Sequence, residues 1–188
     1  MITSFPRLYE VDDQPGYPER YEDALVNFEA TLSLGQASGE VADLLFFPNA
    51  GGCWRGRFRV GMRDRPTLIA ATPNPEVCVI VTGGIAYHVN VTDKTADHIK
   101  MRFPVTQVAE ATASELLMLV DFCDVAAIGR SGVQWRERDL VNDELRVLSV
   151  EGNNLRYAGF ALGETCEYLA EIRLGGLSGI SIVSPSAH

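Results

Sequence analysis

Apolar and polar residues alternate with a period of two along most of the chain, from about residue 24 to residue 174. In the stretch 54–62, for example, Trp54 and Phe58 fall on one face and three arginines fall on the other. A period of two is typical of a β-strand with one buried and one solvated face, because successive side chains point to opposite sides. The alternation therefore predicts a mainly β protein.

The strand patterns are short, and turn residues separate them. They cover residues 24–34, 41–47, 54–62, 67–71, 77–81, 85–91, 99–103, 105–109, 116–120, 125–128, 133–138, 145–150, 155–160 and 168–174. Turn signals rich in Gly, Asn and Pro stand at 48–52, 83–84, 129–132 and 151–154. Thr112-x-x-Glu115 resembles a helix capping box, but the Val- and Leu-rich residues that follow favour a strand.

Two pieces of the pattern recur. Residues 76–87 and 115–127 each hold two consecutive apolar strands, and they lie about 40 residues apart. A Trp-Arg-x-Arg tetrad also occurs twice, at Trp54–Arg57 and at Trp135–Arg138. The repeat has the length of a propeller blade, but the chain has room for about three such units, whereas a propeller has four to eight blades. We therefore predict an antiparallel meander with little helix, arranged as a sandwich, an open barrel or a partial propeller.

The domain organisation follows from where the alternation begins and ends. Residues 1–23 are rich in Pro, Asp, Glu and Tyr, and we expect them to form an irregular acidic arm. A single β-rich domain is predicted for 24–180, followed by a tail over 181–188.

The negative charge of the chain makes some classes of binding partner unfavourable. The net charge is −9, and the first 40 residues hold eight acids against two arginines. A negative surface repels phosphate backbones and anionic lipids, so we expect neither nucleic acid nor membrane as a partner. No apolar run approaches the ~18 residues of a membrane span, and the N-terminal residues lack the pattern of a signal peptide. We therefore expect a cytoplasmic protein.

Motifs for metals, cofactors and catalysis are missing. The cysteines at 53, 78, 123 and 166 form no C-x-x-C pair, and only three histidines accompany them, so no metal-ligand spacing results. The nucleophile-elbow, dinucleotide-binding and phosphate-loop patterns are also missing. We predict no metal site, no cofactor and no catalytic residue, and we interpret the cysteines as inert thiols.

Two stretches carry a family-like pattern: ELLMLVDFCDVAAIGRSGVQWRER at 115–138 and LRVLSVEGNNLRYAGF at 145–160. They resemble a group of uncharacterised bacterial all-β proteins in which an apolar strand leads into an ADFTDIAA-like turn and then a G-x-x-W strand. The likeness extends over about residues 76–160, and Cys123 stands where the pattern has a threonine. It implies no activity and no site residue, because none is assigned to these proteins.

The three arginines of the first tetrad strand, Arg55, Arg57 and Arg59, are the sharpest polar feature. Guanidinium groups on one strand face repel one another unless carboxylates neutralise them, so we expect acidic partners on neighbouring strands or in the acidic arm. The alternative is a docking surface for a small anionic ligand or an acidic protein.

Asp121 and Asp124 lie three residues apart between two predicted strands. Aspartates at such junctions commonly accept backbone N–H bonds and cap the turn. Paired carboxylates also serve as a general acid and base or bind a divalent cation, which is the alternative.

Three further residues are candidates for binding. His88 is predicted to lie on the exposed face of its strand, where a surface role is expected and a catalytic one is the alternative. Trp54 and Trp135 are expected in the core or at a sheet rim, with an interface role as the alternative.

We expect a soluble, non-enzymatic interaction or scaffold protein that forms homo-oligomers, because many strands have edges that need covering. The alternative is a small-ligand-binding protein or a hydrolase-like enzyme with a site near Asp121, Asp124 and the arginine strand.

Overall fold

The computed structural model describes residues 4–12, 25–28, 39–152, 154–160 and 167–173. Apart from one short 3-10 turn, all regular structure in these residues is β-strand. The prediction of a mainly β meander with little helix is therefore confirmed. The chain divides into two compact units, 1–100 and 101–188, and each is described by itself.

The first sheet of unit 1 has the strand order β1-β3-β4-β2. Its strands are β1 (Tyr9–Asp12), β2 (Leu25–Phe28), β3 (Val41–Pro48) and β4 (Trp54–Arg59). β1 and β4 each pair antiparallel with β3, whereas β2 pairs parallel with β4. The parallel pair is the one departure from the predicted antiparallel arrangement within the described residues.

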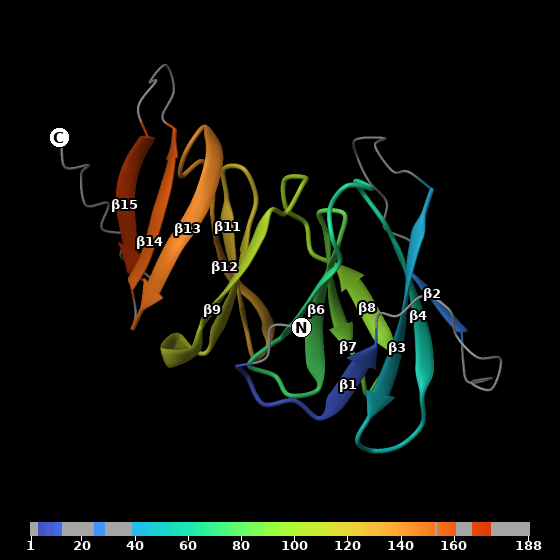
Figure 1. Cartoon of the computed structure of the whole chain (residues 1–188). Coiled ribbons are helices and arrows are strands. Elements are labelled where there is room, and N and C mark those ends of the chain that lie inside the picture. The colour runs from blue at the N-terminus through green and yellow to red at the C-terminus, as the bar shows by residue number, and fades with distance from the viewer. Residues whose placement is uncertain (1–3, 13–24, 29–38, 153, 161–166, 174–188) are drawn as a thin grey trace. The chain divides into compact units, whose positions relative to one another are not determined.

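The second sheet of unit 1 is a meander of consecutive antiparallel strands, visible in green in Figure 1. Its strands are β5 (Leu68–Ala71), β6 (Val77–Thr82), β7 (Ile85–Asn90) and β8 (Thr95–His98). Gly83 and Gly84 form the two-residue turn between β6 and β7, and both have positive φ angles, 56° and 88°. A two-residue turn of this kind matches the twist of the hairpin strands, which explains the Gly-Gly pair.

The core of unit 1 is built from aromatic residues between its two sheets. Trp54 of β4 stacks on Phe46 of β3 with ring centroids 4.1 Å apart. Its indole N–H donates to the carbonyl of Val91 at 2.9 Å. On the same strand Phe58 contacts Tyr87 of β7, with a centroid separation of 5.2 Å. The two sheets therefore pack face to face, and the buried indole N–H has the partner that such a group requires.

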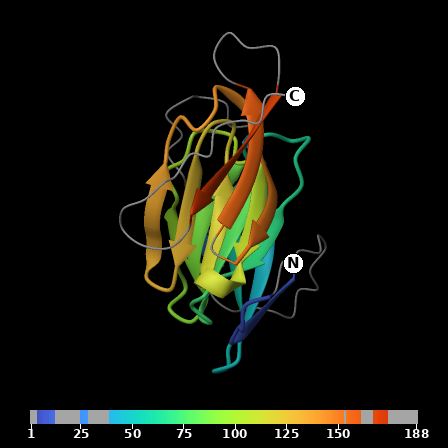
Figure 2. The same cartoon turned by 90° about the vertical axis from the view of Figure 1, so that its left-hand side faces the viewer.

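Unit 2 also contains two sheets. The first is a four-stranded antiparallel meander of β9 (Gln107–Ala111), β10 (Leu116–Val120), β11 (Val125–Gly129) and β12 (Gly132–Glu137). The second consists of β13 (Asp143–Glu151), β14 (Asn154–Phe160) and β15 (Glu167–Arg173). Figure 2 shows the orange β13–β15 sheet lying over the yellow strands of the meander.

The core of unit 2 lies between these sheets. Met118 and Val125 of the meander pack in one cluster with Leu145, Leu155 and Tyr157 of the second sheet. At the edge, Gln107 of β9 joins the two sheets directly. Its amide N–H donates to the carbonyl of Val147 on β13 at 2.9 Å, and its amide oxygen accepts the Val147 N–H at 2.9 Å. The side chain thus occupies both backbone groups that a neighbouring strand would use.

The sequence repeat corresponds to a structural repeat. Residues 76–87 contain β6 and the start of β7, and residues 115–127 contain β10 and the start of β11. In each case these are the two inner strands of a four-stranded meander. The helix alternative at Thr112 reduces to the 3-10 turn Thr112–Ser114, and the following residues are the strand that the apolar pattern favoured.

One strand prediction is wrong. Residues 99–103 form no strand, and β8 lies instead at Thr95–His98, between two of the predicted strands. β8 is an edge strand with Thr95 and Asp97 exposed, so it lacks the apolar alternation that identifies half-buried strands. Ile99 is buried just beyond it, which explains why the apolar signal is displaced.

The structure covers only part of the predicted arm, domain and tail. Residues Tyr9–Asp12, within the arm that we expected to be irregular, form β1 and pair with β3. Residues 13–23 of the arm and the tail 181–188 lie outside the described residues. The single domain over 24–180 stays a prediction beside the two compact units. No helix among the described residues is long and apolar enough to cross a membrane.

Candidate functional site

The turn between β10 and β11 is built around the carboxyl group of Asp121. This residue is fully buried. Its Oδ1 accepts the backbone N–H groups of Cys123 at 2.9 Å and of Asp124 at 2.8 Å. The Asp121 N–H in turn donates to the Asp124 carbonyl at 3.0 Å. Asp121 therefore caps its own turn, as the spacing of the two aspartates predicted.

Asp124 connects this turn to two other segments. Its Oδ1 accepts the N–H of Asp139 at 2.9 Å. Its Oδ2 lies 3.7 Å from the Nε of Arg102, whose Nη2 lies 2.7 Å from the Asp139 carboxylate. Asp124 is buried, whereas Arg102 and Asp139 are exposed. The guanidinium group therefore supplies the buried carboxylate with a counter-charge from the surface.

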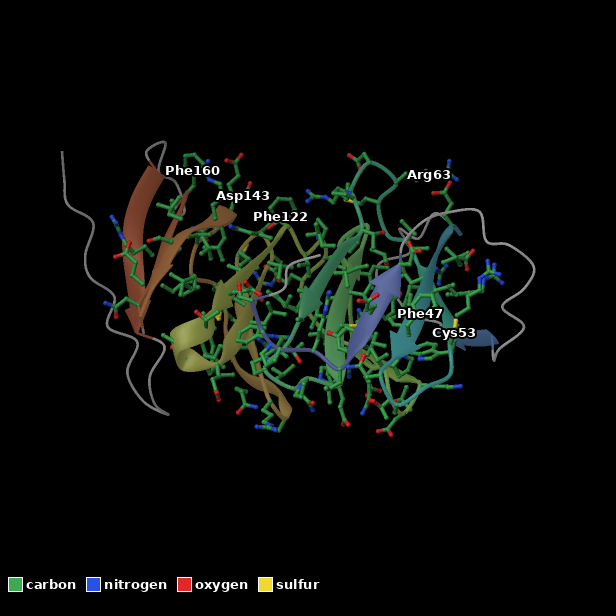
Figure 3. All side chains as sticks on the ribbon, turned by 60° about the horizontal axis from the view of Figure 1, so that its bottom comes forward. Phe47, Cys53, Arg63, Phe122, Asp143 and Phe160 are labelled. Carbon is green, nitrogen blue, oxygen red and sulfur yellow. The ribbon has the colours of Figure 1, made fainter. Side chains whose placement is uncertain are left out.

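The backbone of the same turn holds the segment that leads into β13. The carbonyl of Phe122 accepts the N–H of Leu145 at 2.9 Å, and the carbonyl of Cys123 accepts the N–H of Leu140 at 3.0 Å. The Cys123 thiol donates to the carbonyl of Asn142 at 3.2 Å. Figure 3 shows Phe122 with Asp143 at the same end of this unit. The turn is thus a junction, which we call the 121–124 junction.

One atom of the junction is unsatisfied. The Oδ2 of Asp121 is buried and has no hydrogen-bond partner among the described residues. The Arg102 backbone N–H interacts with this carboxyl group, but without the geometry of a hydrogen bond to Oδ2. Burial raises the pKa of Asp121, the two N–H groups bound to Oδ1 lower it, the charge of Asp124 raises it further, and the Arg102 backbone N–H lowers it. The net direction is upward, because burial disfavours the ionised form.

Cys123 does not have the properties of a nucleophile. Burial raises the pKa of its thiol, and this effect outweighs the lowering by Arg102. The two neighbouring carboxylates, Asp121 and Asp124, raise the pKa of the thiol as well. A thiol in these surroundings stays protonated at neutral pH, whereas nucleophilic cysteines have lowered pKa values. The inert interpretation of Cys123 therefore agrees with its surroundings.

The arginine strand has its acidic partner on the neighbouring strand. Asp43 of β3 accepts from Nη2 of Arg55 at 2.6 Å and from Nε of Arg57 at 3.2 Å. These side chains are partly exposed, and Asp43 lies directly opposite Arg57 in the β3–β4 register. The carbonyl of Arg59 accepts the hydroxyl groups of Thr82 at 2.8 Å and of Tyr87 at 3.1 Å. An internal acidic partner, one of the two interpretations, is thus what the structure contains for Arg55 and Arg57, and this one carboxylate balances one of their two charges.

His88 lies on β7, opposite Asp97 of β8. Its side chain is half-buried, which differs from the exposed position that the sequence predicted. Ala86 lies two residues earlier, on the same face of the strand, and is also buried, so this face of β7 is covered. Burial lowers the pKa of His88, and Asp97 opposes this effect. The imidazole is therefore neutral at neutral pH.

The two tryptophans differ although their sequence tetrads match. Trp54 lies on an inner strand and is fully buried in the core of unit 1. Trp135 lies on β12, the last strand of its sheet, and is half-buried against the core of unit 2. The first occupies a core position and the second a sheet rim, which are the two positions that the sequence suggested.

Three residues of these contacts were missed by the sequence interpretation: Arg102, Asp139 and Gln107. Each acts across a long sequence separation, and none belongs to a recognisable motif. The described residues contain no group of three or more His, Cys, Asp or Glu side chains that could hold a metal ion. The chemistry that remains at the junction is that of a buried carboxyl group beside a second carboxylate.

Comparisons with known proteins add little to this picture. No family model matches the chain, and no curated protein matches it. Among solved structures it is similar to hydrazine synthase of Kuenenia stuttgartiensis, with 13% sequence identity and a TM-score of 0.43 over 85% of this chain. The chain spans about half the length of that protein, with 50% of it covered.

Proposed function

We propose that this protein is a soluble, cytoplasmic, non-enzymatic interaction or scaffold protein that forms homo-oligomers, and that it belongs to the uncharacterised bacterial all-β group that residues 115–160 resemble. The observation that carries the proposal is the edge of β12. In the described part of the chain this strand pairs with β11 alone. Its Val133 side chain is 50% exposed. An edge strand with exposed apolar side chains is a template for pairing with another chain.

The edge also has features that limit indiscriminate pairing. The β11–β12 register shifts between Ala127 and Ile128, which marks a bulge in the ladder. Arg136 and Glu137 place charges at the end of β12. Bulges and charges on edge strands reduce aggregation while they leave room for a specific partner. A second copy of the chain is such a partner, since most soluble oligomers are symmetric homo-oligomers.

The polar candidates support a non-enzymatic role. Oδ1 of Asp121 and both carboxylate oxygens of Asp124 contact groups of the same unit, and Asp43 pairs with both Arg55 and Arg57. These side chains hold strands and turns together. A group that already has a structural partner must lose that contact before it binds a ligand, which weakens binding.

Light scattering coupled to size-exclusion chromatography tests the proposal. We expect the wild-type chain to be a dimer or larger at tens of micromolar and the Val133→Lys variant to be a monomer, because a lysine on an edge strand opposes pairing. Leu8→Lys is the matched control, since Leu8 is a similarly exposed apolar residue in unit 1, at 45%. A monomeric wild-type chain would count against self-association, and equal dissociation of both variants would count against β12.

The alternative is a small-ligand-binding protein or hydrolase-like enzyme with a site near Asp121, Asp124 and the arginine strand. The unsatisfied Oδ2 of Asp121 favours it, because such atoms often face a ligand. The two groups of residues lie in different units, so each is tested separately. Thermal-shift measurements with phosphate, acetate and citrate would support this alternative if a stabilisation disappears in Asp121→Asn or Arg57→Gln.

A further inference from the structure

The 121–124 junction has an excess of negative charge around one unsatisfied oxygen. Asp121 and Asp124 belong to the turn itself, Arg102 comes from the segment before β9, and Asp139 comes from the segment after β12. Cys123, the remaining polar side chain of the turn, is neutral. Among the described residues at this junction, three carboxyl groups therefore share one guanidinium group, and the guanidinium contacts Asp124 and Asp139 rather than the side chain of Asp121.

Asp121 is consequently the carboxyl group with the least compensation. Its Oδ1 has two backbone donors, but its Oδ2 has none and is buried. A buried ionised oxygen without a donor loses its hydration and gains nothing in return. The charge of Asp124 in the same turn adds repulsion. A proton bound to Oδ2 removes the negative charge, and with it the repulsion from Asp124 and the larger cost of burying an ionised oxygen, and it leaves the two bonds to Oδ1 in place.

The turn transmits this effect to a longer segment. The N–H groups of Asp139, Leu140 and Leu145 all donate to acceptors of residues 122–124. These three bonds hold the chain between β12 and β13 against the turn. If the turn is weakened, the same bonds are weakened, and residues 139–145 open with it.

We propose that the 121–124 junction is a proton-linked latch, in which protonated Asp121 holds residues 139–145 closed and loss of its proton favours local opening. The proposal is independent of self-association through β12, because it concerns contacts within a single copy of unit 2. The proton is the ligand. In the closed state the turn accepts hydrogen bonds from the chain after β12, and in the open state these bonds are lost.

The direction of the pH dependence follows from linkage. The pKa of Asp121 is raised in the closed junction. The closed form therefore binds more protons than the open form at pH values above the ordinary range of an aspartate. Closure is fully favoured below that ordinary range, and it weakens as the pH rises through the pKa of the closed form. Each unit of pKa difference changes the opening equilibrium by a factor of about ten.

Hydrogen exchange measured by mass spectrometry on the full chain tests the latch. Exchange of peptides covering 119–126 and 137–147 is compared for the wild type and Asp121→Asn at pH 5 and pH 8, always between proteins at the same pH. Asparagine keeps the Oδ1 acceptor and carries no charge, so it mimics the protonated residue. We expect several-fold faster exchange of the wild type than of the variant at pH 8, and a smaller difference between the two proteins at pH 5.

Two further measurements keep the result unambiguous. Asp139→Asn removes an exposed charge of the same junction and is expected to leave the ratio between pH 5 and pH 8 unchanged. Carbon-13 NMR of the Asp121 carboxyl group reports its titration directly and does not depend on whether a variant folds. A titration at or below the ordinary aspartate range, or a protection difference that does not vary with pH, would overturn the proposal.

Discussion

Removing the Gln107 side chain is expected to separate the two sheets of unit 2 at their shared edge. The amide of this residue makes two hydrogen bonds of 2.9 Å to the backbone of Val147 on β13. Gln107→Ala leaves the Val147 N–H and carbonyl without these partners in a partly buried position. Each buried group left unsatisfied costs about 1–3 kcal/mol. Because water reaches the partly buried edge, we place the total loss near the lower end, at about 2–3 kcal/mol.

Urea denaturation followed by far-UV circular dichroism measures this loss, with Gln134→Ala as the matched control. Gln134 also donates twice, to Ser131 Oγ at 2.8 Å and to the Gly132 carbonyl at 3.2 Å, but it is exposed. Water replaces exposed hydrogen bonds, so the control is expected to lose less than about 1 kcal/mol. If Gln107→Ala loses no more stability than Gln134→Ala, the edge contact does not join the sheets energetically and the argument fails.

Three further predictions concern residues of unit 1, and the first has its control, Gly152, in unit 2. Gly83→Ala places a Cβ 2.5 Å from the Met62 carbonyl oxygen at a φ of +56° and is expected to cost at least about 3 kcal/mol. Gly152→Ala, at φ +58° with open space around it, is expected to cost about 1 kcal/mol by the same denaturation assay, and equal losses would refute the steric reason. Asp43→Asn leaves Arg55 and Arg57 without their shared counter-charge and is expected to cost about 1 kcal/mol, with a loss that shrinks in 1 M salt. Because burial lowers the pKa of His88, its folded form binds fewer protons than its unfolded form, and stability falls as the pH drops below about 6.5. NMR titration of the imidazole checks this, and a value above the ordinary histidine range would contradict it.

Local patterns predicted the strands well where apolar residues mark one or both faces as buried. The strand 116–120 was placed at its observed bounds, because five consecutive apolar residues follow a polar turn. β8 was missed, because an edge strand with polar exposed side chains carries no period-two signal. The short acidic β1 was missed for a related reason, since it is identified by its pairing with β3 rather than by its composition.

For the candidate residues, too, local arrangements were predictable and contacts between distant segments were not. The capping role of Asp121 was predictable, because an aspartate two or three residues before the N–H groups it accepts is a local arrangement. The unsatisfied Oδ2 was not predictable, because it depends on which segments cover the turn. The partner of the arginines was predictable as a class, a carboxylate on a neighbouring strand, but Asp43 itself follows from the β3–β4 register.

The sequence by itself determined the mainly β architecture, the positions of most strands and the repeat of two inner-strand pairs, because these follow from the period and the turn chemistry of neighbouring residues. Tertiary structure decided that Trp54 is a core residue whereas Trp135 lies at a rim, although their tetrads match. It also decided that Gln107 and Arg102 join segments that the chain separates by up to 40 residues. Such contacts depend on which strands become neighbours, and the local sequence does not specify which strands pair.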